Sequence, residues 1–210
     1  MASTAVQLSR PTALIIIDLQ KAIDDPIWSA EGTRNNPQAE ENTSRMLSAW
    51  RELSLPIYHV RHDSHSLTSP YRPGQSGNDL KLEIRLSDDE KIVVKGTNSA
   101  FIGTDLEAQL RGNGATATVM AGVITNNSVE ATVRIAGNLG FNVYLPEDAS
   151  FTFARRDYFG VLRTAAEVHA MSLANMNAEY CTVVRTQDIL EAARRFLAHE
   201  HAAPVPSLGQ

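Results

Sequence analysis

The sequence predicts an α/β fold in which a mostly parallel sheet is covered by helices on both faces. Short apolar runs of strand length alternate with longer stretches of helical periodicity along the chain. Strands that alternate with helices in this way form parallel sheets, because each crossover helix returns the chain to the same end of the sheet. Residues at several expected helix boundaries have the chemistry of helix starts and stops, which supports the same fold class.

The elements can be placed in order. Strands are expected at residues 12–18, 55–61, 91–95, 116–123, 142–146 and 181–184. Helices are expected near residues 38–53, 104–111, 128–139, 161–176 and 186–199. Three boundaries support these ranges: Pro37 suits a first helical turn, Thr104 with Glu107 resembles a capping box, and Gly140 is suited to stop the helix at 128–139.

Length and composition indicate one domain over residues 1–210. The chain has 43% apolar residues and no low-complexity linker, so it can bury one sizeable core. A net charge of −5 without a dense Lys/Arg cluster argues against nucleic acid as a partner. No apolar run is long enough to span a membrane and the N-terminus lacks a secretory pattern, so a cytoplasmic protein that binds no membrane is expected. The single cysteine, Cys181, lies in a strand-like run and is expected to be buried and inert.

Polar residues stand where three of the expected elements meet. The run at 13–17 leads into Asp18, the run at 92–94 leads into Lys95, and Ser128 lies where a turn becomes a helix. Strand ends of an open parallel sheet meet at one edge, and helix starts present unpaired N–H groups. We therefore expect Asp18, Lys95 and Ser128 to share one crevice, in which Ser128 either only caps its helix or takes part in the chemistry.

Two irregular segments, residues 24–36 and 63–90, follow strand ends and are expected to overhang this crevice. Trp28, Tyr71 and Phe101 are candidate walls of a substrate pocket. Gln20 follows Asp18 by two residues and is expected to point to the same side, where it would hydrogen-bond Asp18 or the substrate. Such a pocket predicts a small-molecule substrate.

Three ordered motifs give the chain a resemblance to the isochorismatase-like cysteine hydrolases. They are LIIIDLQ at 14–20, KGTNSAF at 95–101 with GTDL at 103–106, and AGVITNNSVEAT at 121–132. Residues 147–149 and 168–170 also fit, so the resemblance covers about residues 11–190, which we take as the core of the domain. It implies a three-layer Rossmann-like fold with a six-stranded mostly parallel sheet, a homo-oligomer (dimer or tetramer), no cofactor, and an Asp, Lys, Cys triad.

By position, Asp18 and Lys95 match the acid/base and the lysine of that triad, while Ser128 stands at the place of the nucleophilic cysteine. The resemblance also implies a cis peptide bond at Val123–Ile124 and an oxyanion hole made by the amides of Ile124 and Ser128. Ile124 and Asn127 are accordingly expected to contact substrate.

The serine leaves two enzymatic mechanisms open. Proton transfer from a thiol to an aspartate, each with its ordinary pKa, is unfavourable by about 6 kcal/mol. A serine hydroxyl is a far weaker acid than a thiol, so the same transfer is less favourable still. The isochorismatases that the chain resembles lack the cysteine and cleave a vinyl ether, with the aspartate as proton donor. We therefore expect a metal-independent hydrolase in which Asp18 is the acid/base and Ser128 with backbone amides holds the reacting oxygen.

The first alternative is an amide or carbamoyl hydrolase, similar to nicotinamidases, in which Ser128 is the nucleophile or replaces a catalytic cysteine. The second is an inactive homologue that binds a metabolite or a partner protein. Asp63 and His65 match the first two zinc ligands of the related nicotinamidases, but no third ligand follows in the expected loop. We expect no metal there.

Overall fold

The computed structural model describes residues 6–9 and 11–202, with the side chains of the last four left out. Residues 1–5 and 10 lie outside the described residues. The expectation that the N-terminus carries no secretory signal falls on this segment. Six parallel strands form the main sheet in the order β3-β2-β1-β4-β5-β9. Their bounds are β1 Thr12–Ile17, β2 Ile57–His62, β3 Lys91–Lys95, β4 Ala117–Val123, β5 Asn142–Pro146 and β9 Thr182–Val184. The predicted α/β fold with a mostly parallel sheet is confirmed.

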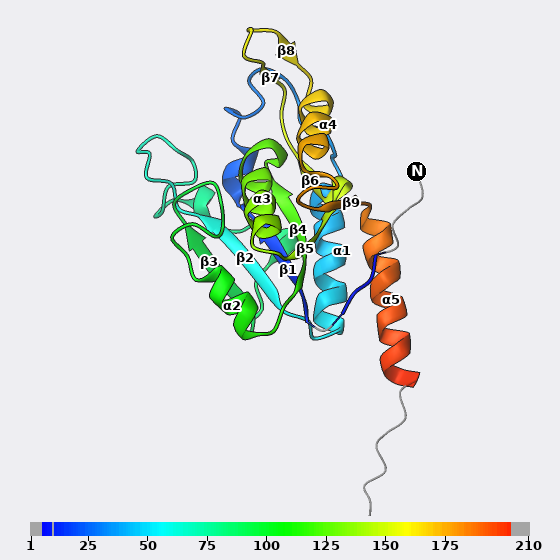
Figure 1. The fold of residues 1–210 in the computed structure, drawn as a ribbon. Coiled ribbons are helices and arrows are strands. Elements are labelled where there is room, and N and C mark those ends of the chain that lie inside the picture. The colour runs from blue at the N-terminus through cyan, green and yellow to red at the C-terminus, as the bar shows by residue number, and fades with distance from the viewer. Residues whose placement is uncertain (1–5, 10, 203–210) are drawn as a thin grey trace, which may run out of the picture.

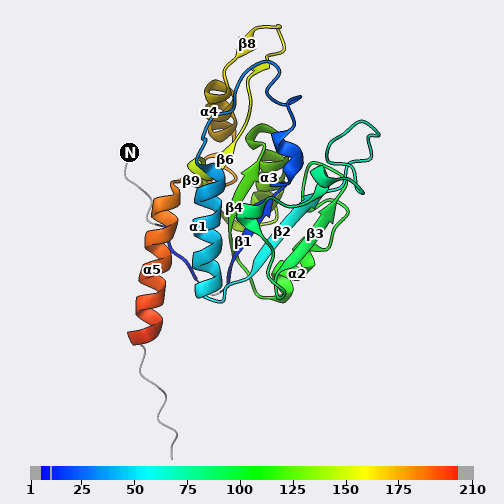
Figure 2. The same cartoon turned by 180° about the vertical axis from the view of Figure 1, so that it is seen from behind.

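The helices cover both faces of this sheet (Figures 1 and 2). Helices α1 and α5 pack on one face, whereas α2 and α3 pack on the other. Their bounds are α1 Ala39–Glu52, α2 Leu106–Gly112, α3 Glu130–Asn138, α4 Ala165–Met176 and α5 Thr186–Ala202. Each strand-helix unit therefore returns the chain to the same sheet end, as the alternating sequence pattern requires.

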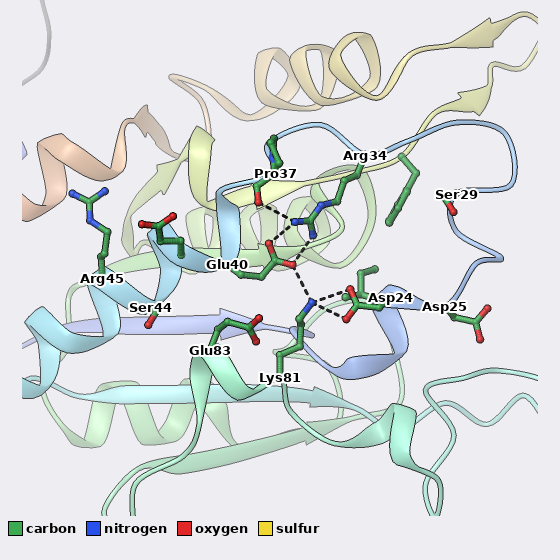
Figure 3. Close-up of a pocket in the computed structure, with 13 residues that line it drawn as sticks. Asp24, Asp25, Ser29, Arg34, Pro37, Glu40, Ser44, Arg45, Lys81 and Glu83 are labelled. Atoms are coloured by element: carbon green, nitrogen blue, oxygen red, sulfur yellow. Dashed lines mark hydrogen bonds and ion pairs between the residues drawn. The ribbon is translucent and has the colours of Figure 1, made fainter.

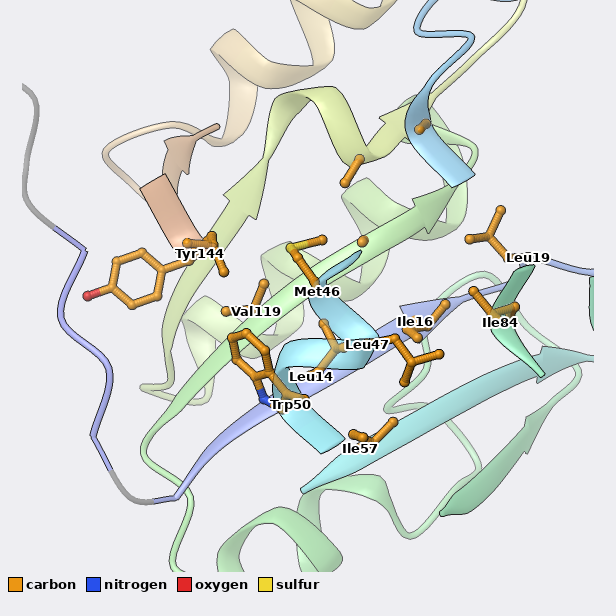
Figure 4. Close-up of a cluster of buried hydrophobic side chains, with 14 of the residues drawn as sticks. Leu14, Ile16, Leu19, Met46, Leu47, Trp50, Ile57, Ile84, Val119 and Tyr144 are labelled. Atoms are coloured by element: carbon orange, nitrogen blue, oxygen red, sulfur yellow. The ribbon is translucent and has the colours of Figure 1, made fainter. Parts of the chain in front are cut away.

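Strand β1 shows why the sequence is continuously apolar there. Leu14 and Ile16 enter the core beneath α1, where Met46 and Trp50 also pack (Figure 4). The alternate residues of the strand, among them Ile15, enter the second core beneath α2 and α3. Because successive side chains point to opposite faces, a strand buried on both sides needs apolar residues throughout.

Three short features differ from the expected elements. A two-residue strand, β6 Ser150–Phe151, pairs in parallel with the end of β4 and gives the sheet a seventh strand. An antiparallel hairpin, β7 Arg155–Arg156 with β8 Leu162–Arg163, takes the place of the first turn of the helix expected at 161–176. A single π-helical turn at Thr125–Val129 precedes α3.

The expected helix boundaries are partly correct. Gly140 adopts φ +84° just beyond α3, the left-handed conformation of a C-terminal stop. The capping box expected at Thr104 is wrong, because α2 begins after Asp105 without a side-chain cap. A capping box is present instead at α4, where Thr164 and Glu167 bond each other's backbone N–H groups.

Candidate active site

Asp18 directly follows β1 and is held by its backbone. Its φ of +53° lies in the left-handed region, which is uncommon for a residue with a side chain. The Asp18 N–H donates to the carbonyl of Val60 at 3.0 Å, and its own carbonyl accepts from the N–H of Gln20 at 2.8 Å. Strained backbone persists where surrounding bonds determine it, so these contacts fix the direction of the carboxyl group.

Lys95 ends β3, two strands away from Asp18, and its side chain is fully buried. The ammonium group donates to Oδ2 of Asp18 at 2.7 Å, to the carbonyl of Thr97 at 3.0 Å and to Oγ of Ser128 at 3.3 Å. Its three protons are therefore directed at three different oxygens. Lys95 is the group that joins the aspartate to the serine.

Ser128 reaches this cluster from the π-helical turn, which follows the cis peptide bond Val123–Ile124. The residue is 8% exposed, and Thr132 of α3 donates to its carbonyl at 2.7 Å. The wider turn places the Ser128 hydroxyl between a strand end and a helix start. The structure thus brings together Asp18, Lys95 and Ser128, as their positions at element ends predict.

The Asp18 carboxyl is the unusual electrostatic feature of the cluster. Burial raises its pKa above the ordinary value, and the positive charge of Lys95 offsets part of that rise. Its Oδ1 atom is buried and has no hydrogen-bond partner among the described residues. A buried oxygen without a partner is unfavourable unless something else binds it. This arrangement leaves one carboxyl oxygen free to exchange a proton with a bound molecule.

Aromatic rings cover the backbone of Asp18. The Tyr71 hydroxyl donates to the Asp18 carbonyl at 3.3 Å, and the ring of Tyr71 meets Trp28 and His62 edge to face, with centroids 6.0 Å and 5.8 Å away. Trp28 is fixed in turn by a bond from its indole N–H to the carbonyl of Ala22 at 2.8 Å. Segments 24–36 and 63–90 are thus joined next to Asp18.

His62 is a neighbour of the site to which the sequence analysis gives no role. It lies opposite Lys95 in the β2-β3 register, and its Nδ1 is buried without a hydrogen-bond partner among the described residues. Burial and the charge of Lys95 lower the pKa of His62 to about 4, so the ring is neutral at physiological pH. The signal in the sequence was its place at a strand end, like that of Lys95.

The identity of the fold follows from comparison with known proteins. Residues 12–197 match the isochorismatase domain. The chain belongs to the isochorismatase family. The isochorismatase family protein YrdC of Bacillus subtilis (strain 168), itself uncharacterized, is 40% identical over 178 residues, which cover 85% of this chain and 94% of YrdC. A crystal structure of an isochorismatase-family protein from Chromobacterium violaceum is 52% identical and superposes with a TM-score of 0.87, covering 91% of this chain and 98% of that chain.

Two relatives of this isochorismatase-family chain carry names that state a hydrolytic activity. Streptothricin hydrolase of Streptomyces noursei is 29% identical over 143 residues, which cover 67% of this chain and half of the relative. Nicotinamidase 3 of Arabidopsis thaliana is 28% identical over 161 residues, which cover 69% of this chain and 75% of the relative. Family and relatives together support a hydrolase.

Two residues proposed to bind substrate have other contacts in this isochorismatase-family structure. Gln20 is fully buried, and its amide bonds the backbone of His62 at both the N–H and the carbonyl and also the carbonyl of Asn78. It therefore ties strand and loop together, with both amide hydrogens engaged and the amide oxygen accepting from the His62 N–H. Phe101 stacks on Phe141 with centroids 6.1 Å apart and packs on the core beneath α2 and α3. This packing is the contact that the structure gives Phe101, and its place in a pocket wall stays a prediction.

The two remaining residues that were predicted to contact substrate, Ile124 and Asn127, lie in the turn that carries Ser128. Ile124 is half-buried against the core beneath α1, and its carbonyl accepts from Asn127 N–H at 3.1 Å and from Val129 N–H at 3.4 Å. Asn127 is exposed. A buried histidine of α4 supports the same turn, since His169 Nδ1 lies 2.8 Å from the hydroxyl of Thr125.

The residues at 61–65 do not fit a zinc site. Both carboxyl oxygens of Asp63 bond Arg61, and one also accepts from Asn78. His65 is exposed beside Gly96. Within the ranges that the structure describes, no three His, Cys, Asp or Glu side chains are close enough to hold a metal ion.

A charged cavity of about 610 Å³ lies beside segment 24–36 (Figure 3). Glu40 of α1 is bonded there by Arg34 at 2.7 Å and by Lys81 at 3.1 Å, and Lys81 also bonds Asp24 at 2.8 Å. Although burial raises the pKa of the Glu40 carboxyl, the bonds from Arg34 and Lys81 outweigh it and lower the pKa. These paired charges join both irregular segments to α1, which fixes the loops that carry Trp28 and Tyr71.

Proposed function

We propose that the protein is a hydrolase of small molecules in which Asp18 transfers the proton, Lys95 holds the Asp18 carboxylate, and Ser128 binds the reacting oxygen. The observation that carries this proposal is that the two oxygens of the Asp18 carboxyl have different surroundings. Lys95 binds one oxygen at 2.7 Å, while the other is buried and has no hydrogen-bond partner among the residues that the structure describes, and burial raises the carboxyl pKa. A protonated carboxyl in such a setting is suited to general acid catalysis.

For a vinyl ether substrate the steps use only these groups and water. Asp18 donates its proton to the terminal carbon of the double bond, and the oxocarbenium ion that forms is attacked by water. The tetrahedral adduct then releases an alcohol and a ketone, and Asp18 recovers a proton. Lys95 stabilises the transient carboxylate, and the Ser128 hydroxyl with the Ile124 and Ser128 amides holds the substrate oxygen. We expect no metal and no cofactor in this reaction.

A second candidate is hydrolysis of an amide or carbamoyl group with Ser128 as the nucleophile. It is favoured by the 3.3 Å contact between Lys95 Nζ and Ser128 Oγ, and by the names of the relatives that hydrolyse streptothricin and nicotinamide. Here Ser128 Oγ would attack the carbonyl carbon while Asp18 accepts the hydroxyl proton. The C–N bond would then break as Asp18 returns that proton to the leaving amine or ammonia, and water would hydrolyse the acyl-serine ester to give the acid and free Ser128. An ordinary aspartate is a poor base for a hydroxyl, which is why we place this reaction second.

A substrate screen with purified protein separates the candidates. The panel contains isochorismate, nicotinamide, N-carbamoyl compounds and small amides, each also incubated with the Asp18→Asn variant. We expect turnover of the vinyl ether that Asp18→Asn loses, with no mass added to Ser128 during the reaction. Turnover of amides with an acyl adduct on Ser128 in the mass spectrum supports the second candidate. Failure of the whole panel with tight binding of one compound supports a metabolite-binding homologue, although the buried ion pair of Asp18 and Lys95 argues against it.

A further inference from the structure

Helix α4 turns a partly polar face toward the segment that carries Ser128. It lies beyond the carboxyl end of β4, next to the turn that precedes α3 (Figure 1). The side chains that α4 buries, Ala165, His169, Ser172 and Met176, are spaced by four, three and four residues and therefore share one side of the helix. Burial of an imidazole and a hydroxyl is unfavourable unless hydrogen bonds compensate for it, so the partners of His169 and Ser172 are the key to this face.

Both polar side chains contact one residue, Thr125, which begins the π-helical turn and is fully buried. The Thr125 hydroxyl lies 2.8 Å from Nδ1 of His169, and the Thr125 carbonyl accepts from the Ser172 hydroxyl at 3.2 Å. The Ser172 hydroxyl has a single hydrogen, which the Glu130 carboxylate also attracts at 2.6 Å. The contact with His169 is therefore the stronger of the two that α4 makes with Thr125.

The surroundings of the other ring nitrogen indicate the direction of this bond. Nε2 of His169 lies 3.5 Å from the amide nitrogen of Asn36, which donates its two hydrogens to the carbonyls of Glu147 and Ser150 at 2.7 Å and 2.8 Å. Asn36 therefore has no hydrogen for the ring, which favours the tautomer with the hydrogen on Nε2, so that Nδ1 accepts from the Thr125 hydroxyl. Burial lowers the pKa of His169, although the Glu147 carbonyl opposes this, and the ring is neutral at physiological pH.

The fourth residue of the turn, Ser128, is held from the opposite side. Its carbonyl accepts from the Thr132 hydroxyl at 2.7 Å, and that hydroxyl in turn accepts from the N–H of Ala100 at 3.1 Å, in the loop that follows Lys95. The turn is thus held by α4 at Thr125 and by the Lys95 loop at Ser128. The Lys95 Nζ to Ser128 Oγ contact of 3.3 Å is at the long limit of a hydrogen bond, so a small displacement of the turn would break it.

We propose that His169 is a positioning residue, which acts through Thr125 to hold the Ser128 hydroxyl and the amides of the turn against Lys95. This inference rests on the function proposed above, in which these groups bind the reacting oxygen. Donors of this kind stabilise a developing charge only when they are held in place beforehand, and small displacements of them reduce the rate strongly. A histidine that served only the stability of α4 would leave the properties of residue 128 unchanged.

The thiol pKa of a Ser128→Cys variant tests the proposal without a substrate. It is measured from the pH dependence of alkylation by iodoacetamide, with mass spectrometry to distinguish residue 128 from Cys181. Addition of His169→Leu, which is similar in volume but has no acceptor, should raise the thiol pKa by about one unit, so that the thiolate fraction at pH 6 falls about tenfold. His169→Asn, whose side-chain oxygen can replace Nδ1 as acceptor, should restore most of this loss.

Thr125→Val tests the route of the effect. It removes the same hydrogen bond from the other side and should raise the thiol pKa equally. The two substitutions together should raise it no further than either one alone, because they remove one shared contact. Met176→Ala is the matched control, since Met176 lies on the same buried face of α4 but packs in the core beneath α2 and α3. It should lower the stability to urea and leave the thiol pKa unchanged, whereas additive effects of the first two substitutions would contradict the route through Thr125.

The outcomes separate this inference from the proposed function. A depressed thiol pKa that His169→Leu and Thr125→Val leave unchanged, in variants that circular dichroism shows to be folded, would overturn the role of His169 alone. If His169→Leu does not fold, the nearly isosteric Thr125→Val decides in its place. An ordinary thiol pKa of about 8.5 in the parent variant would instead contradict the anion-stabilising site. Crystal structures of the two variants with Ser128 intact then decide the positioning, with the Lys95 to Ser128 contact expected to open and an unchanged 3.3 Å contact refuting the proposal.

Discussion

At the scale of single residues, the proposed chemistry depends on how Lys95 divides its hydrogen bonds. It binds Oδ2 of Asp18 at 2.7 Å and the Ser128 hydroxyl at 3.3 Å, so the shorter contact is to the carboxylate. The remaining oxygen, Oδ1, is buried and has no hydrogen-bond partner in the described part of the chain. A neutral carboxyl is favoured by burial and a charged one by Lys95, and the pKa of Asp18 lies above its ordinary value as a result.

The pH dependence of kcat/KM distinguishes the two roles of Asp18. If Asp18 donates the proton, only its protonated form is active, so kcat/KM should fall about tenfold per pH unit above a pKa that is higher than the ordinary 3.8. The Ser128→Ala variant should show the same decrease of kcat/KM with rising pH. If Asp18 is instead the base for Ser128, kcat/KM should rise with pH over that range, and a rising limb would contradict the acid mechanism.

Ser128→Cys tests whether the site is built to stabilise an anion at residue 128. A thiol within reach of Lys95 and at a helix start should have a depressed pKa, so iodoacetamide should alkylate it rapidly below the ordinary thiol pKa of about 8.5. The native Cys181 is an internal control, because burial raises its pKa to about 12. Alkylation of the variant no faster than that of a free thiol would show that residue 128 lacks this stabilisation.

At the scale of elements, sequence patterns predicted the strands and helices that have a regular apolar period. They missed features that depend on individual hydrogen bonds. The apolar run of β1 and its place in a parallel sheet follow from period and alternation. The hairpin does not, because Val161 and Leu162 continue the helical pattern of α4, while the bonds of Asp157 bend the chain back at that point. Gln20 was predicted to point to the site from its spacing alone, but the backbone groups of His62 and Asn78 engage its amide, and spacing carries no information on such distant partners.

Gly122 is the position where the β1-β4 pair leaves no room for a side chain. Its φ is +129°, and a Cβ there would overlap the backbone of Ile17. Gly122→Ala should therefore lower the free energy of unfolding by roughly 1–3 kcal/mol or more, measured by urea denaturation. Gly112→Ala, at the open end of α2 where a Cβ meets nothing, is the control and should be neutral or stabilising by up to about 1 kcal/mol. Equal stabilities of the two variants would show that the Ile17 contact does not constrain Gly122.

At the scale of the whole molecule, two long loops are fastened so that the ends of β1, β3 and β4 form one site. The ion pairs of Glu40 attach both loops to α1, and Tyr71 attaches the loop at 63–90 to the backbone of Asp18. Within the described part of the chain, no helix has the length and apolar character needed to cross a bilayer. The resemblance to the family correctly indicated the fold and the meeting of the three site residues, whereas the loop contacts beside Asp18 arise from tertiary structure.

The metal content of the purified protein tests one consequence of this architecture. Asp63 is engaged by Arg61 and Asn78, so protein purified without added metal should contain zinc well below one ion per chain by elemental analysis. Addition of zinc should not raise activity. Stoichiometric zinc that Asp63→Ala removes would contradict the metal-independent mechanism.

The central claim is that Asp18 is the essential acid and Ser128 only lines the site. Measurement of kcat/KM for Asp18→Asn and Ser128→Ala, on the substrate found in the screen, tests it most directly. We predict that Asp18→Asn abolishes turnover, whereas Ser128→Ala loses about one hydrogen bond, roughly a tenfold effect or less. A Ser128→Ala variant that is folded and binds substrate but has no activity would contradict the claim and identify Ser128 as the nucleophile.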